Sequence, residues 1–200
     1  MKIKITIILL LAIVVSAFTI NKQEKIVKVE EFQKEADTLG LKFVMPENYK
    51  ETVVKKNRDL WYSFAIKNKD ADFEIRYTIR SLKPQFEEYE KCKLDKNCLM
   101  INPNNIYKGT TMTSVLNMTA GQGAEIGPLP AEAVKSEFNA DAGGSAFFEF
   151  NCEFGKGYKY GQMVFLHKEN VADVIITYLS NDVDVHSNLM MEPFHALTFK

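Results

Sequence analysis

Residues 146–179 read AFFEFNCEFGKGYKYGQMVFLHKENVADVIITYL. The stretch holds three runs rich in aromatic and branched side chains, at 146–154, 158–168 and 171–179. Runs of this length and composition are typical of β-strands. FGKGY joins the first two runs and KEN joins the last two, and connections this short link neighbouring antiparallel strands. The stretch therefore predicts a three-stranded antiparallel meander.

A β-hairpin is predicted closer to the N-terminus, from strands at 60–66 and 73–80 with a polar turn between them. In the second strand, apolar residues alternate with the polar residues Glu74, Arg76, Thr78 and Arg80. Alternation with a period of two is typical of an antiparallel strand that buries one face and exposes the other. We therefore expect Arg76 and its polar neighbours on a solvent-exposed face of the sheet.

Helical spacing of apolar residues, with Gly or Pro near the ends, marks further segments of the chain. The predicted helices cover residues 29–39, 112–121, 130–138 and 184–191. The order of elements is thus helix, strands, helices, strands, helix. It predicts an α+β fold with an antiparallel sheet of about five or six strands, made of the N-terminal hairpin and the C-terminal meander and packed with helices.

The N-terminal segment, residues 1–17, has the organisation of a secretory signal peptide. Lys2 and Lys4 precede an unbroken apolar run at 7–15, and small residues follow up to Ala17. We expect cleavage after Ala17. Retention as a membrane anchor is the alternative, because the apolar stretch approaches the length of roughly 17–20 residues that spans a bilayer.

The rest of the chain is expected to comprise a polar lead-in at 18–28 and a single globular α+β domain at 29–200. Once the signal peptide is removed, the protein is predicted to be exported, periplasmic or extracellular. No stable membrane insertion is expected after cleavage. The mature chain has 23 basic and 26 acidic side chains, because Lys2 and Lys4 are lost, and its net charge of −3 gives no attraction to an anionic membrane.

Composition excludes several classes of protein. Apolar residues make up 46% and charged residues 26% of the 200 residues, which is typical of a globular protein and excludes a wholly disordered one. The net charge is −1, from 25 Lys and Arg against 26 Asp and Glu. No basic cluster marks a nucleic-acid binder, so nucleic acid is not an expected partner.

Three cysteines lie at 92, 98 and 152. In an oxidising compartment, Cys92 and Cys98 are predicted to form a disulfide that closes the polar loop KCKLDKNC. A redox-active or metal-binding cysteine pair is the alternative. Cys152 alternates with phenylalanines and is expected to be a buried free thiol.

Asp182, Asp184 and His186 form a D-x-D-x-H cluster that suits two different roles. Carboxylates and imidazole bind divalent cations, which makes the cluster a candidate metal site. Asp residues just before an apolar helical pattern also cap a helix N-terminus, and this second interpretation is favoured. Under it, replacing His186 is expected to leave stability unchanged.

Two further regions are candidates for a binding surface. Trp61 is an aromatic anchor near the predicted sheet face that carries Arg76. Residues 138–145 form a predicted loop in which Asn139, Asp141 and two glycines favour special backbone geometry, and loops often carry function.

The segment LKFVMPENY at 41–49, the aromatic hairpin and the closing ALTF at 196–199 resemble the PsbP-like and DcrB-like group of exported α/β proteins. The cysteine loop and the Gly/Pro-rich segment at 121–130 depart from that group. Because its members are mostly non-catalytic accessory or uncharacterised proteins, the resemblance implies a function other than catalysis. It assigns no residue a role.

The first hypothesis for function is therefore an exported, monomeric, non-catalytic accessory or binding protein of bacterial type. Its expected partner is another envelope protein or a small ligand, and no cofactor is expected. The alternative is a cell-envelope hydrolase or metal-binding enzyme that uses residues 138–145 or 182–186. A redox protein based on Cys92 and Cys98 is the third hypothesis.

Overall fold

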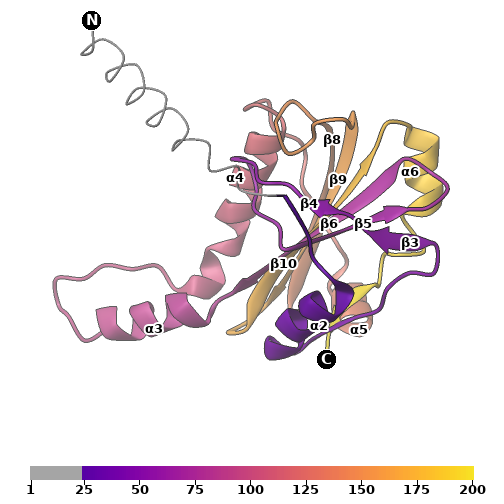
Figure 1. The fold of residues 1–200 in the computed structure, drawn as a ribbon. Helices are drawn as coiled ribbons and strands as arrows, with labels where there is room; N and C mark the ends of the chain where they lie inside the picture. The colour runs from indigo at the N-terminus through magenta and orange to yellow at the C-terminus, as the bar shows by residue number, and fades with distance from the viewer. Residues whose placement is uncertain (1–23) are drawn as a thin grey trace, which may run out of the picture.

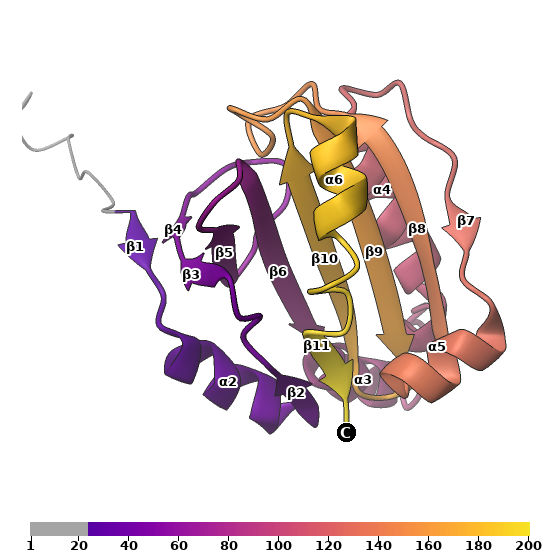
Figure 2. The same ribbon diagram turned by 90° about the vertical axis from the view of Figure 1, so that its right-hand side faces the viewer.

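The computed structural model describes residues 24–200, so the predicted signal peptide at 1–17 and residues 18–23 of the lead-in lie outside the described residues. Within that range, seven antiparallel strands form the main sheet in the order β3-β5-β6-β10-β9-β8-β7 (Figure 2). Their bounds are β3 Tyr49–Glu51, β5 Phe64–Asn68, β6 Phe73–Ser81, β7 Gly127–Pro128, β8 Ala142–Glu149, β9 Tyr160–Lys168 and β10 Ala172–Ser180. The α+β class, the hairpin β5-β6 and the meander β8-β9-β10 are confirmed.

Strand β10 is the centre of the sheet. All nine of its residues pair with β6 on one side and with β9 on the other, and every one of them is buried. The register places Asp173 of β10 directly opposite both Arg80 of β6 and His167 of β9. Three ionisable side chains thereby lie in one row across three adjacent strands.

Both faces of the sheet are covered, which makes the domain a three-layer structure (Figures 1 and 2). One face carries α2 (Val29–Thr38), α5 (Ala131–Phe138), α6 (Val183–Leu189) and a small sheet of β2 (Leu41–Phe43) and β11 (Leu197–Phe199). We call this the first face. The second face carries α4 (Tyr107–Met118).

Each face has its own apolar core. On the first face, α2 buries Phe32 against Phe64 of β5, with stacked rings 4.5 Å apart, and Tyr77 of β6 lies beside them. On the second face, Val115 and Met118 of α4 pack with residues of β8, β9 and β10. The predicted helix at 29–39 buries its apolar stripe, at Phe32 and Ala36. The predicted helix at 112–121 begins earlier, at Tyr107, and its expected core residues Met112 and Leu116 are exposed.

The remaining elements lie at the edges. Strands β1 (Lys25–Ile26) and β4 (Val53–Val54) pair with each other. Helix α3 (Lys83–Cys92) and the loop after it extend away from the body, and the 3₁₀ turn η1 (Pro103–Asn105) leads back to α4 (Figure 1). No helix within residues 24–200 combines the length and apolar character needed to cross a membrane.

The predicted strand at 146–154 is shifted in the structure, and part of the predicted loop at 138–145 is strand. Strand β8 begins at Ala142 and ends at Glu149. Gly143 and Gly144 belong to the strand because they pair with Leu166 and Phe165 of β9. The ring of Phe165 lies so close to Gly144 that a Cβ atom there would come within 2.6 Å of it, which accounts for a glycine inside the strand. Phe150, beyond the strand, is half-buried.

Candidate functional site

The predicted exposed position of Arg76 is wrong, because loop segments cover that part of the second face. Arg76 is only 2% exposed, and its Nε donates to Glu74 Oε1 at 2.6 Å. Its guanidinium lies 5.0 Å from the ring centre of Tyr62 and 4.7 Å from that of Phe154, and it donates to the Phe154 carbonyl. Arg76 therefore fastens the 150–158 loop to the sheet.

At the other end of the same face, the row of Arg80, Asp173 and His167 forms a hydrogen-bonded chain. Asp173 Oδ1 lies 2.6 Å from His167 Nδ1, and its Oδ2 accepts from Arg80. Arg80 Nη1 also donates to Thr110 Oγ1 of α4 at 3.3 Å. The chain links the centre of the sheet to the helix above it.

The imidazole of His167 is enclosed. Tyr107, in the first turn of α4, stacks on it with ring centres 4.3 Å apart and an interplanar angle of 12°. His167 Nε2 is buried and has no hydrogen-bond partner within residues 24–200. The His167–Asp173 pair resembles the orienting half of a catalytic triad, but no hydroxyl or thiol of the described chain hydrogen bonds to Nε2.

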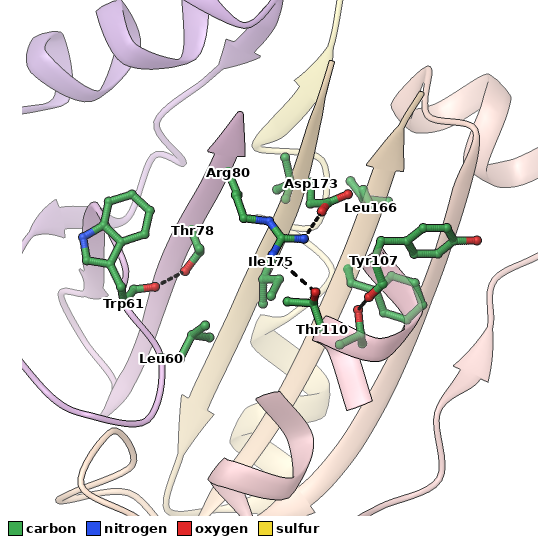
Figure 3. Close-up of a pocket in the computed structure, with 12 residues that line it drawn as sticks. Leu60, Trp61, Thr78, Arg80, Tyr107, Thr110, Leu166, Asp173 and Ile175 are labelled. Carbon is green, nitrogen blue, oxygen red and sulfur yellow. Dashed lines mark hydrogen bonds and ion pairs between the residues drawn. The ribbon is translucent and has the colours of Figure 1, made fainter. Parts of the chain in front are cut away.

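A cavity of about 200 Å³ lies between α4 and the second face, beside Arg80 (Figure 3). We call it the Arg80 cavity. Phe165 of β9 and Ile175 of β10 form its floor, α4 forms one wall, and Leu60 and Trp61 of the loop before β5 form the other. Trp61, predicted as an aromatic anchor, is a residue of this rim that turns its carbonyl toward Thr78 and its indole away from the cavity, and it is 58% exposed (Figure 3).

The surface of the Arg80 cavity is almost entirely apolar although three threonines line it. Thr78 Oγ1 donates to the carbonyl of Trp61 at 2.7 Å. Thr110 and Thr111 donate back into α4, to the carbonyls of Ile106 and Tyr107 at 3.2 and 2.8 Å. Because the hydroxyls are engaged with backbone and Arg80 is paired with Asp173, the cavity can receive an apolar group without leaving a buried polar atom unpaired.

A second cavity of about 430 Å³ lies on the other side of Tyr107. We call it the Lys108 cavity, since Lys108 of α4 lines it together with residues of β7, β8 and α5. Its surface is more mixed in polarity and includes Asp141. Three residues, Tyr107, Thr111 and Phe165, line both cavities.

The structure does not bring Asp182, Asp184 and His186 together as ligands. Asp182 is the N-cap of α6, and its Oδ1 accepts from the backbone N–H groups of Asp184 and Val185 at 2.7 and 3.2 Å. His186 points into the first face, where burial lowers its pKa below the ordinary value. No group of three His, Cys, Asp or Glu suited to a metal ion occurs among the described residues.

Asn139 and Asp141 hold the end of α5 in place. Asn139 adopts a left-handed conformation with φ 49° at the helix C-terminus, and its side chain donates to the carbonyl of Lys200. Asp141 accepts from Lys135 Nζ at 3.1 Å and from the Glu169 N–H at 2.9 Å. Burial raises the pKa of Asp141, but the hydrogen bonds from the Glu169 N–H and Lys135 Nζ act against it, and the pKa is lowered below the ordinary value.

Cys92 and Cys98 form a disulfide, as predicted, at the far end of α3. Cys152 lies outside it and is half-buried, and burial raises the pKa of its thiol. A thiol with a raised pKa is poorly suited to act as a nucleophile.

Sequence reasoning did not single out Arg80 and Asp173 as a site. A signal was nevertheless present, because Asp173 interrupts the apolar run VADVIITYL of a central strand, and a carboxylate in such a position requires a buried partner. No family model matches the chain, and the search of curated proteins gives no match either.

Proposed function

We propose that this chain is an exported, non-catalytic binding protein that takes a small apolar molecule, or an apolar part of one, into the Arg80 cavity. The observation that carries the proposal is the apolar cavity itself, placed between α4 and the central strands with an exposed Trp61 at its rim. The Cys92–Cys98 disulfide supports export, because disulfides persist in oxidising compartments. The resemblance to PsbP-like and DcrB-like proteins remains a prediction that agrees with an accessory role.

The size of the cavity indicates the size of the ligand. An apolar protein cavity of about 150 Å³ is large enough to bind benzene. The Arg80 cavity, at about 200 Å³, therefore suits a single ring with one small substituent. Toluene meets this description and carries no polar group, so it is the first probe.

Trp61 provides the readout, because it is the only tryptophan of the chain and lies at the rim of the cavity. We expect toluene to cause a saturable change in Trp61 fluorescence of the exported protein. Thr110→Phe should place a ring in the cavity and weaken binding by roughly tenfold or more, because the apolar contact area is lost.

Thr113→Phe is the matched control, since Thr113 is an exposed residue of the same helix that does not line the Arg80 cavity. It should bind toluene as the wild type does. The proposal is wrong if the wild type gives no saturable change, or if the two variants lose affinity equally.

A further inference from the structure

We infer that the natural ligand is a linear amphiphile, with an alkyl chain that runs beneath α4 through both cavities and an anionic head group at Lys108. The inference rests on the proposed function and deepens it. It starts from the partition between the cavities, which consists of the side chains of Tyr107, Thr111 and Phe165. A partition made of side chains can open by a change of rotamer, without movement of the main chain.

Tyr107 is the movable part of this partition. It is half-buried, and its ring is held by contacts with the rings of His167 and Phe165 and by Lys108 Nζ, with no hydrogen bond of its hydroxyl within residues 24–200. The Thr111 hydroxyl donates to the Tyr107 carbonyl, so an alkyl chain that passes Thr111 meets no unpaired polar group there. With the Tyr107 ring rotated away, the two spaces of about 200 and 430 Å³ would be separated beneath α4 by Thr111 and Phe165 alone.

The difference in polarity between the two cavities indicates the orientation in which the ligand binds. The Arg80 cavity is almost wholly apolar and suits the end of an alkyl chain, whereas the Lys108 cavity has a mixed surface and suits a head group. Lys108 forms no ion pair with any carboxylate in the described part of the chain, and its Nζ lies 5.8 Å from the Tyr107 ring centre.

Asp141 lies in the same cavity, but its carboxylate is already bound by Lys135 and by the Glu169 N–H. The unengaged charge at this mouth is thus positive. A terminal carboxylate or phosphate therefore matches it better than a cationic head group.

A chain-length series tests the inference. Hexanoate, octanoate, decanoate and dodecanoate are titrated by calorimetry into the exported protein, with dodecanol as the uncharged comparison. Affinity should rise by up to roughly fourfold for each methylene that becomes buried. Lys108→Gln should weaken dodecanoate several-fold and leave dodecanol unchanged.

A pair of variants on α5 locates the chain. Ala131 is exposed and lines the Lys108 cavity, whereas its neighbour Glu132 is exposed and does not. Ala131→Phe should weaken dodecanoate by roughly tenfold but leave toluene binding unchanged, and Glu132→Phe should affect neither. Thr110→Phe should abolish the extra affinity that the longest carboxylates have over the shorter ones.

The inference is overturned if toluene binds while the four carboxylates bind equally, or if Ala131→Phe leaves dodecanoate unaffected. It is also overturned if Lys108→Gln weakens dodecanol as much as dodecanoate. Failure of the proposed function gives a different result, which is the absence of toluene binding sensitive to Thr110→Phe.

Discussion

Tyr107 stacks on His167 with their ring centres 4.3 Å apart, and this contact joins the first turn of α4 to the end of β9. The row of ionisable side chains beneath it, Arg80, Asp173 and His167, spans three strands, and Arg80 also hydrogen bonds to Thr110 of the same helix. The Arg80–Thr110 hydrogen bond holds this end of α4 over the sheet and does not involve the Tyr107 ring. The two cavities lie on either side of this fixed end, with Tyr107 as their common wall.

Replacing Asp173 tests whether the row of Arg80, Asp173 and His167 stabilises the fold. Asp173→Asn removes the charge that Arg80 and His167 share, and should lower the free energy of unfolding by about 2–4 kcal/mol, less than a fully buried pair because Arg80 is partly exposed. Urea denaturation measures this change. Asp37→Asn, at an exposed pair with Lys200, is the control and should stay within about 0.5 kcal/mol. Equal effects at the two sites would contradict a structural role for the row.

Arg76 gives the clearest contrast between the exposed position predicted from sequence and the buried one in the structure. Arg76→Met leaves the buried Glu74 carboxylate without its cation, with only the Tyr158 hydroxyl still donating to it, and frees the Phe154 carbonyl, and should cost about 3–5 kcal/mol of stability. Arg58→Met, at an exposed loop residue, should be nearly neutral. A loss below about 1 kcal/mol for Arg76→Met would place its side chain at the surface.

His186 should make stability depend on pH. Burial lowers its pKa below 6.5, so the unfolded chain takes up a proton more readily than the folded one. The free energy of unfolding should therefore be highest above pH 6.5 and fall as the pH drops from there toward the lowered pKa of the folded state. His186→Gln should show a shallower fall than the wild type over this window, and the exposed Asn188→Gln should show the same fall as the wild type. Parallel curves for all three proteins would exclude His186 as the titrating group.

The same burial changes the expectation for His186→Ala. A capping role for the 182–186 segment alone would leave this variant neutral, but His186 contacts Phe73, Phe147 and Tyr178. His186→Ala should therefore lower the free energy of unfolding by about 2–4 kcal/mol, because it leaves a cavity in the core.

Because Cys92 and Cys98 form a disulfide, we expect one free thiol per chain. The exported protein, unfolded under non-reducing conditions, should react with one equivalent of a thiol reagent, through Cys152. Cys92→Ser together with Cys98→Ser should cost about 2 kcal/mol, because the loop that the bond closes is short. Cys152→Ser removes the thiol without touching the bond and is the control. Three reactive thiols in the wild type would show that the bond does not form.

Structural features that depend only on residues close together in the chain were predicted correctly from local sequence patterns. The meander follows from apolar runs with short turns, the cap at Asp182 from its position before a helix, and the disulfide from six-residue spacing. Alternation in β6 correctly put Arg76 and Arg80 on one face, but it carries no information about which distant segment covers that face. Here the 150–158 loop and α4 do so.

The candidate site depends on register between distant strands, which explains why it was not predicted. Arg80 and Asp173 are 93 residues apart and meet only because β6 and β10 pair residue by residue over nine positions. The glycine pair in β8 was interpreted as loop for a similar reason. These glycines are in a strand because they pair with Leu166 and Phe165 of β9, and local sequence does not reveal that pairing.

The most direct test of the account is a titration of the methyl-labelled protein with toluene, followed by NMR. We expect saturable shifts that centre on the methyl groups of Thr110, Thr111 and Ile175, and in Thr110→Phe the shifts of Thr111 and Ile175 should be lost. A spectrum that shows no saturable shift up to the solubility limit of toluene, or one whose shifts centre on methyl groups outside the Arg80 cavity, would contradict it.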